Sequence, residues 1–271
     1  MTESDNSTAS GDTTRRVSPG RYPAAVTLED LRRNLASVQA RIACACRRVG
    51  RDPAHVRLLP VTKTLDEHRI RISYAAGCRQ FGENKAQEAH RKWEATADLA
   101  DIRWSVIGHL QTNKAKFVAR FAAEFQALDS LRVAEALERR LQASGRSLDV
   151  FVQVNTSGEA AKYGLPPDDV AAFLTEMPRY SALRVRGLMT LARLSPDAEQ
   201  ARMCFMTLRT LRDRLRHDAP DGVALDELSM GMSGDFEIAV EEGATVVRIG
   251  QALYGARNVA DSDLSQADAQ R

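Results

Sequence analysis

The stretch that decides the fold is LDVFVQVNTSGEAAKYGLPPDDVAAFLTEMPRYSALRVRGLMTLA, residues 148–192. It begins with the strand candidate LDVFVQVNTS at 148–157, whose continuous apolar run VFVQV is typical of a strand buried on both faces. PPDDVAAFLTEM at 166–177 has helical patterning, and LRVRGLMTLA at 183–192 predicts a second strand. A helix between two strands lets them lie parallel, joined by a right-handed crossover. The stretch therefore predicts one β-α-β unit of an α/β fold.

The same alternation extends in both directions from this unit. Further strand candidates, most of them followed by helical patterning, lie at 56–64, 80–84, 102–109, 124–130, 225–233 and 245–255. Eight strands with helices between them predict a single (β/α)8 TIM barrel, and residues 27–52 predict an extra N-terminal helix. An open, doubly wound sheet would show the same alternation. We favour the barrel because the count is eight and no G-x-G-x-x-G motif opens the first unit.

Composition limits the class of protein. The chain has 271 residues, of which 44% are hydrophobic and 27% charged, values that suit a globular protein with a sizeable core. The net charge is only +2, with basic and acidic residues interleaved, so we expect no nucleic-acid partner. No apolar run approaches the roughly 18 residues that a membrane span needs. We therefore expect no membrane association.

Cysteine spacing and the two chain ends complete this outline. Cys44, Cys46, Cys78 and Cys204 show no metal-binding spacing, so we predict reduced thiols in a cytoplasmic protein without a metal site. The ends are rich in small and polar residues, which is typical of flexible tails. We therefore predict three segments. They are a tail at 1–25, the barrel at 26–257 and a second tail at 258–271.

Functional side chains of a parallel barrel lie at the carboxyl ends of its strands. The residues at these predicted ends are nearly all polar. They are Lys63, Asn84, His109, Ser130, Asn155, Met189 with Thr190, the loop 229–233, and the turn 248–250. We expect them to face one another around the barrel mouth.

The loop SMGMSGD at 229–235 has the composition of an anion-binding loop. Gly231 and Gly234 would let an anion approach the main chain, and Ser229 and Ser233 could donate hydroxyl hydrogens. The helix predicted from Asp235 would direct its positive end inward. A glycine-rich turn in which Ser233 caps the helix remains the alternative. The loops after strands seven and eight often bind phosphate in such barrels, and Gly250, after Arg248, would form a second wall.

Lys63 ends the first strand candidate among apolar and β-branched neighbours. Partial desolvation and nearby positive charge would favour its neutral amine, which can attack a carbonyl to form a Schiff base. Pyridoxal phosphate (PLP) needs such an amine and an anion site for its phosphate. A Schiff-base aldolase acting on sugar phosphates would need the same pair, and a lysine that merely extends to solvent remains an alternative.

Six motifs occur in a fixed order: LLPVTKT, FGENKAQEA, WSVIGHLQTNKAK, VFVQVNTSGEAAKYGL, RGLMTLA and LSMGMSGDFEIAVEEGATVVRIGQALYGAR. Together they resemble the YggS/PROSC family of PLP homeostasis proteins, over residues 27 to 257. The resemblance implies a barrel like that of alanine racemase and a covalent PLP aldimine on Lys63. It also implies a cofactor site that includes Asn84, Met189 near the ring, and Ser229, Gly231, Ser233, Arg248 and Gly250 around the phosphate.

Three positions depart from the family pattern. Lys85 occupies a place where an aromatic residue is common, and Ala161 one where a serine precedes the lysine, which puts a role for Lys162 in doubt. The family often has proline where this chain has His109, so we interpret that histidine as a loop residue.

The resemblance implies a binding protein that holds PLP without significant turnover and supplies PLP-dependent apo-enzymes. Only a polar stretch follows LYGAR at 253–257, so we expect no second domain to bring a base to the other cofactor face, and we expect a monomer. The alternatives are a PLP-dependent amino-acid racemase that uses Lys63 and water, and a Schiff-base lyase without PLP.

Overall fold

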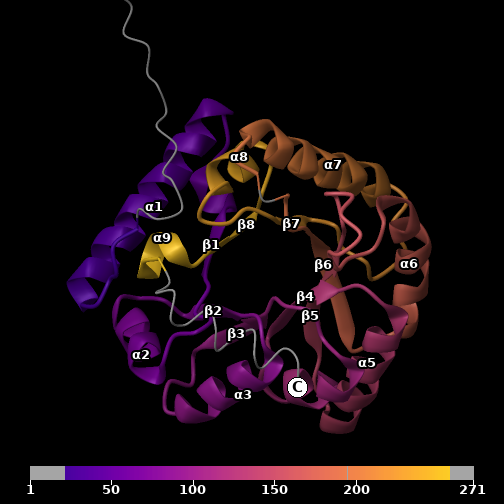
Figure 1. Cartoon of the computed structure of the whole chain (residues 1–271). Coiled ribbons are helices and arrows are strands. Elements are labelled where there is room, and N and C mark those ends of the chain that lie inside the picture. Colours follow the sequence, from indigo (N-terminus) through magenta and orange to yellow (C-terminus); the bar gives the residue numbers. More distant parts are fainter. Residues whose placement is uncertain (1–21, 194, 257–271) are drawn as a thin grey trace, which may run out of the picture.

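Eight strands enclose the centre of the molecule, and the helices surround them (Figure 1). The computed structural model describes residues 22–193 and 195–256. The strands are β1 (Arg57–Pro60), β2 (Gln80–Glu83), β3 (Arg103–Val106), β4 (Glu124–Leu128), β5 (Leu148–Gln153), β6 (Leu183–Met189), β7 (Glu227–Ser229) and β8 (Val246–Ile249). Each lies within one of the eight predicted strands.

The sheet closes into a barrel. Its strand order is β1-β8-β7-β6-β5-β4-β3-β2, and every pair is parallel. The first and last strands are neighbours, and a bridge between Val61 and Gly82 joins β1 to β2. An open sheet would leave two separated edges, so the predicted (β/α)8 barrel is confirmed.

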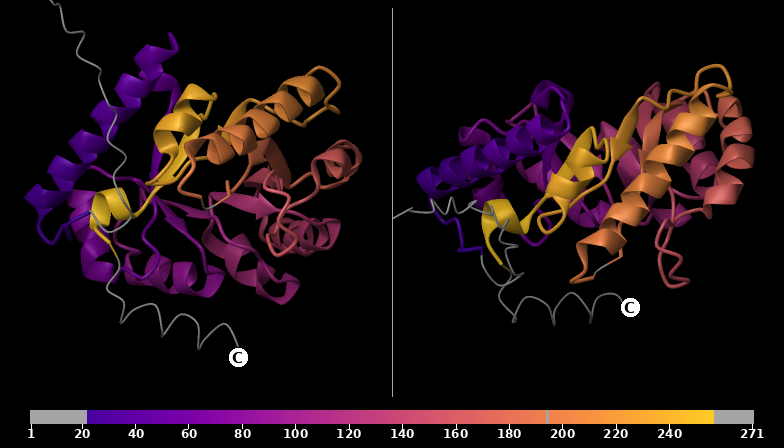
Figure 2. Two further views of the ribbon diagram at one scale, coloured as in Figure 1. Left: turned by 45° about the horizontal axis from the view of Figure 1, so that its top comes forward. Right: turned by 90° about the horizontal axis from the view of Figure 1, so that it is seen from above.

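The helices cover the outside of the barrel (Figure 2). They are α1 (Leu28–Arg48), α2 (Glu67–Ala75), α3 (Ala86–Ala95), α4 (Ala115–Phe121), α5 (Leu131–Ser144), α6 (Val170–Glu176), α7 (Ala198–Arg216), α8 (Phe236–Glu241) and α9 (Gln251–Tyr254). In α5 the buried residues Val133, Leu137 and Leu141 recur every four positions and form the face that packs inward. This periodicity explains why α5 was recognisable in the sequence.

Helix α1 is the predicted extra N-terminal helix. Thr27 and Asp30 form a capping box at its start, and Leu31, Val38 and Ile42 are buried on its inner face. The helix packs against α8 and α9 (Figure 1). It therefore covers the seam where the first and last strands meet.

The structure corrects two predicted segments. The last strand candidate, 245–255, divides into β8 and the short helix α9. Residues 22–25, expected to belong to a flexible tail, pack on the barrel: the Ala25 amide donates to the Tyr254 carbonyl, and Ala25 is buried. The remainder of that tail, 1–21, and the predicted tail at 258–271 lie outside the described residues. No helix in the described ranges has the length and apolarity to cross a membrane.

Candidate functional site

The mouth of the barrel brings the strand-end residues together. Because all eight strands are parallel, their carboxyl ends open on the same side. Strand β1, which leads to Lys63, lies between β2, which leads to Asn84, and β8, which carries Arg248. The Val61 amide donates to the Ile249 carbonyl at 2.8 Å, so the Lys63 turn starts beside the turn that contains Gly250. Residues that are far apart in sequence thus share one rim.

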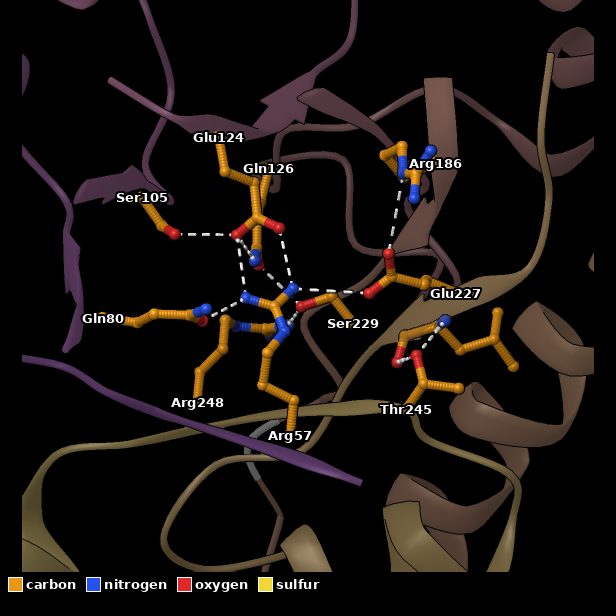
Figure 3. A network of polar contacts seen from close by, with 11 residues as sticks. Arg57, Gln80, Ser105, Glu124, Gln126, Arg186, Glu227, Ser229, Thr245 and Arg248 are labelled. Carbon is orange, nitrogen blue, oxygen red and sulfur yellow. Dashed lines mark hydrogen bonds and ion pairs between the residues drawn. The ribbon is translucent and has the colours of Figure 1, made fainter. Parts of the chain in front are cut away.

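Arg248 lies inside the barrel just below this rim and is 3% exposed. Its guanidinium donates to the Ser229 hydroxyl at 2.6 Å (Figure 3). It also donates to the Thr190 carbonyl at 2.8 Å. Burial lowers its pKa to about 10, and the charge of Asp235 opposes that effect. Within residues 22–193 and 195–256, no carboxylate forms an ion pair with Arg248. The site therefore contains a buried cation that neutral oxygens hold in place.

Ser229 is fully buried at the end of β7. Its hydroxyl donates to Gln126 Oε1 at 2.7 Å and accepts the bond from Arg248. The single hydroxyl hydrogen is thus already used within the protein. In this arrangement Ser229 orients Arg248.

The polar contacts continue from the mouth to the opposite end of the barrel (Figure 3). Gln126 donates to Glu124 Oε2 at 2.7 Å, and Glu124 accepts from Arg57 at 2.7 Å. The sequence analysis did not identify Gln126 and Glu124. They occupy alternate positions of the buried strand β4, so both side chains face the same side of the sheet, and this spacing was a signal that could have been used. They point into the barrel from β4.

The loop between β7 and α8 shows why its glycines are needed. Gly231 has a φ of +94°, and a Cβ there would lie 2.5 Å from Ala239 Cβ on α8. Backbone conformation and packing therefore both require this glycine. A Cβ at Gly234 would meet no heavy atom within 4 Å, so the space beside Gly234 is open.

Ser233 links this loop to α9. Its hydroxyl accepts from the Ala252 amide at 3.1 Å, and its carbonyl accepts from the Tyr22 hydroxyl at 3.0 Å. Ser233 therefore caps α9, whereas the residue that precedes α8 is Asp235. The hydroxyl still carries a hydrogen that it can donate.

Asn84 and Met189 also lie at strand ends, as the sequence predicts. Asn84 is half-buried after β2, and a Cβ on Gly108 would lie 2.1 Å from its carbonyl oxygen. The loop after β3 is thus packed directly on Asn84. Met189 ends β6 and is fully buried below the rim.

His109 lies beside the side chains of two other loops. Its Nδ1 is 3.4 Å from Asp129 Oδ2, and its ring stacks on Tyr163 with centroids 3.8 Å apart. The prediction of a loop position is consistent with this placement, since His109 follows β3. Tyr163 is exposed and was not identified from the sequence.

The other mouth candidates have local structural roles. The Ser130 hydroxyl accepts from the Val133 amide and caps α5. The side-chain amide Nδ2 of Asn155 donates to the carbonyls of Glu159 and Lys162, which folds the loop after β5. Lys162 donates to the Ala192 carbonyl at 3.0 Å. In the part of the chain that the structure describes, no three His, Cys, Asp or Glu side chains converge as metal ligands.

Comparison with known proteins assigns the chain to a family. Residues 27–258 match the family described as alanine racemase, N-terminal domain. A pyridoxal phosphate homeostasis protein of Pseudomonas aeruginosa is 44% identical over 227 residues, covering 83% of this chain and 95% of that relative. Another, of Aquifex aeolicus, is 40% identical over 223 residues, covering 82% of this chain and 96% of the relative. The chain belongs to the pyridoxal phosphate homeostasis protein family.

Two solved structures are similar to the chain at different levels of sequence identity. PipY of Synechococcus elongatus, solved with PLP bound, is 36% identical with a TM-score of 0.74, and the match covers 83% of this chain and all of PipY. Alanine racemase of Streptomyces lavendulae is 17% identical with a TM-score of 0.66, covering 90% of this chain and 62% of the racemase. The racemase shares the barrel fold. The family resemblance read from the six motifs is therefore confirmed.

Proposed function

We propose that this protein binds PLP at the barrel mouth, through an aldimine with Lys63, and takes part in PLP homeostasis. The observation that carries the proposal is the buried Arg248, without a carboxylate ion-pair partner among the described residues, on the strand next to the Lys63 strand. Burying a cation without a direct ion-pair partner costs free energy, which the charge of Asp235 opposes and a bound anion would offset further. The names of the relatives and the PLP-bound PipY structure support the same ligand.

The residues present fit the chemistry of PLP. The Lys63 amine would attack the aldehyde carbon, form a C=N bond and release the aldehyde oxygen as water. The phosphate would be attracted by Arg248, and Ser233 could donate its hydroxyl hydrogen to it. The open space beside Gly234 gives an anion access to the main chain.

The other residues would shape the site. In this proposal Asn84 lies beside the cofactor, Met189 packs near the ring, and Gly231 and Gly250 keep the backbone of the two phosphate-side turns compact. Ser229 would act by orienting Arg248, because its own hydrogen is donated to Gln126.

We propose holding and transfer of PLP as the function, with PLP-dependent apo-enzymes as recipients. The protein would act in the cytoplasm as a monomer. Binding a reactive aldehyde as an imine lowers its free concentration while leaving it recoverable by hydrolysis. A deuterium wash-in assay on several amino acids tests turnover. Exchange at the α-carbon near one per second, within the usual range of enzyme turnover, would contradict a holding role.

The test of the site itself uses absorbance and covalent trapping. Protein mixed with PLP should absorb in the near-visible, and borohydride should fix a pyridoxyl group on the peptide that contains Lys63. Lys63→Ala should abolish both signals. Lys85→Ala, at an exposed lysine on the adjacent loop, is the matched control and should retain both. A pyridoxyl group on any other lysine would overturn the proposed linkage.

A further inference from the structure

The turn that carries Lys63 rests on three charged side chains outside the site described above. Glu83 ends β2, and Glu88 and Lys92 lie one turn apart on α3. Glu83 is fully buried, Lys92 is 8% exposed and the Glu88 side chain is 21% exposed. Charged side chains are rarely enclosed to this degree unless they are paired. Their position under the Lys63 turn therefore needs an explanation.

Lys92 is the centre of the group. Its ammonium donates to Glu83 Oε1 at 2.8 Å and Glu88 Oε1 at 2.7 Å. Its third bond goes to the backbone carbonyl of Thr62 at 2.9 Å. All three hydrogens of the ammonium are thus used, and one of them holds the residue before Lys63.

Glu88 holds the residue after Lys63. Its Oε1 accepts from the Thr64 amide at 3.1 Å. Thr64 has a φ of +70° and is the one non-glycine residue with positive φ among those described. A β-branched residue adopts this strained conformation only where its surroundings impose it. The bond from Thr64 to Glu88 is one such constraint.

Glu83 holds the same turn by a side chain. Its Oε1 accepts from the Thr62 hydroxyl at 2.5 Å as well as from Lys92. Its Oε2 is buried and has no hydrogen-bond partner within the described ranges. Burial raises the pKa of Glu83, and Lys92 opposes that shift. Two carboxylates, of Glu83 and Glu88, share one ammonium here, so the group contains one more anion than cations.

We propose that Glu83, Glu88 and Lys92 form a clamp that positions Lys63 for attack on the PLP aldehyde. The clamp bonds Thr62 and Thr64, the two neighbours of Lys63, and so determines the direction in which the Lys63 side chain leaves the rim. The inference rests on the proposed function, because it concerns the lysine that would bind PLP. These three are positioning residues that act through the backbone of the turn.

Glu88→Ala is the principal test, because Glu88 is partly exposed and its loss leaves Lys92 paired with Glu83. We expect the affinity for PLP to fall about tenfold or more, since a misplaced reacting group loses the benefit of orientation. The aldimine band should weaken relative to total bound PLP. Glu88→Gln should recover most of the affinity, because an amide oxygen can still accept from the Thr64 amide.

A second measurement does not depend on PLP. Amide hydrogen exchange of the unliganded protein should accelerate at residues 62–65 in Glu88→Ala, whereas exchange in the sheet should stay unchanged. Lys92→Met should have a larger effect on the same peptide. If Lys92→Met does not fold, because two carboxylates lose their partner, Glu88→Ala still decides the question.

Arg71→Met is the matched control. Arg71 makes exposed ion pairs with Glu67 and Asp98 and also donates to the Ala95 carbonyl, so its assigned partners lie outside the Lys63 turn. The clamp would be overturned if PLP affinity and amide hydrogen exchange in the two clamp variants, Glu88→Ala and Lys92→Met, were the same as in Arg71→Met. Failure of the wild-type protein to form a borohydride-fixed adduct at Lys63 would instead overturn the proposed function, so the two failures are distinguishable.

Discussion

At the scale of single residues, Cys78 shows how enclosure controls reactivity. The thiol is partly buried beyond α2, and burial raises its pKa from 9.0 to about 11, with Arg79 opposing the shift. The thiolate is the form that reacts with alkylating reagents. We therefore expect iodoacetamide at pH 8 to modify the exposed Cys44 well before Cys78. Peptide mass spectrometry measures the order.

The same shift affects stability at high pH. Because the folded pKa of Cys78 lies above the ordinary value, its contribution to stability is complete below pH 9 and is lost as the pH rises toward about 11. Cys78→Ser should reduce this dependence. Early alkylation of Cys78 at pH 8 would show that the thiol is not enclosed as described.

At the scale of elements, the capping box of α1 provides a local test. The Thr27 hydroxyl accepts from the Asp30 amide, and the Asp30 carboxylate accepts from the Thr27 amide, both at 3.1 Å. Thr27→Ala should lower Tm by about 2–4 °C, the usual effect of losing an N-cap in a domain of this size. Calorimetry measures the change, and Thr27→Ser should preserve Tm.

The capping box also has a pH signature. Hydrogen bonds from the side chain and backbone of Thr27 lower the pKa of Asp30 from 3.8 to about 2. A lowered folded pKa contributes stability above pH 3.8 that is lost as the pH falls toward about 2. The difference in Tm between wild type and Thr27→Ala should therefore shrink over that range. A constant difference would contradict the assigned bonds.

Pairing of β6 with β7 depends on Gly187. A Cβ at this position would lie 1.8 Å from the backbone oxygen of Glu227, its partner on β7. Gly187→Ala should therefore cost about 3 kcal/mol or more of unfolding free energy, because backbone must move. Gly82→Ala on β2 is the control, since its Cβ would meet Leu59 Cδ2 at 3.3 Å and a flexible side chain can adjust. Urea unfolding of both variants measures the contrast, and equal losses would contradict it.

At the scale of the whole molecule, Arg57 joins distant strands across the barrel interior (Figure 3). From β1 it contacts Gln80 on β2 at 2.7 Å, Glu124 on β4 at 2.7 Å and Glu227 on β7 at 3.4 Å. Arg57→Met should lower the free energy of unfolding by about 3 kcal/mol at pH 7. This value is near the low end of the range for breaking a buried ion pair, because the Arg57 side chain is 29% exposed. The loss arises from two carboxylates without their cation.

The pH dependence of this variant distinguishes charge from packing. Burial raises the pKa of Glu227, and Arg57 opposes the shift, so removing Arg57 raises that pKa further. A carboxyl with a raised folded pKa gains stability as the pH falls through that pKa toward 4.5. The loss in Arg57→Met should therefore be smaller at pH 5 than at pH 7 in urea unfolding. Arg184→Met is the control: it removes a pair between the exposed Arg184 and the half-buried Asp149, and should change the free energy of unfolding by at most about 0.5 kcal/mol at either pH.

The barrel and the place of its mouth could be predicted from the sequence. Apolar periodicity is local, so each strand and helix is visible within ten to twenty residues, and parallel strands necessarily open their carboxyl ends on the same side. Lys63, Asn84 and Arg248 were placed at that rim for this reason. The division of 245–255 into β8 and α9 was missed, because an apolar run does not distinguish a strand from a short helix.

The partners of each polar side chain were decided only by the tertiary structure. Ser229 donates to Gln126, 103 positions earlier, and Lys92 reaches Thr62 across 30 positions. Such contacts exist only once β1 has met β8 and the interior has closed. A local pattern specifies which residues face inward, but the closure of the barrel determines which of them meet, because hydrogen bonds depend on distances of a few ångströms in space and not on separation along the chain.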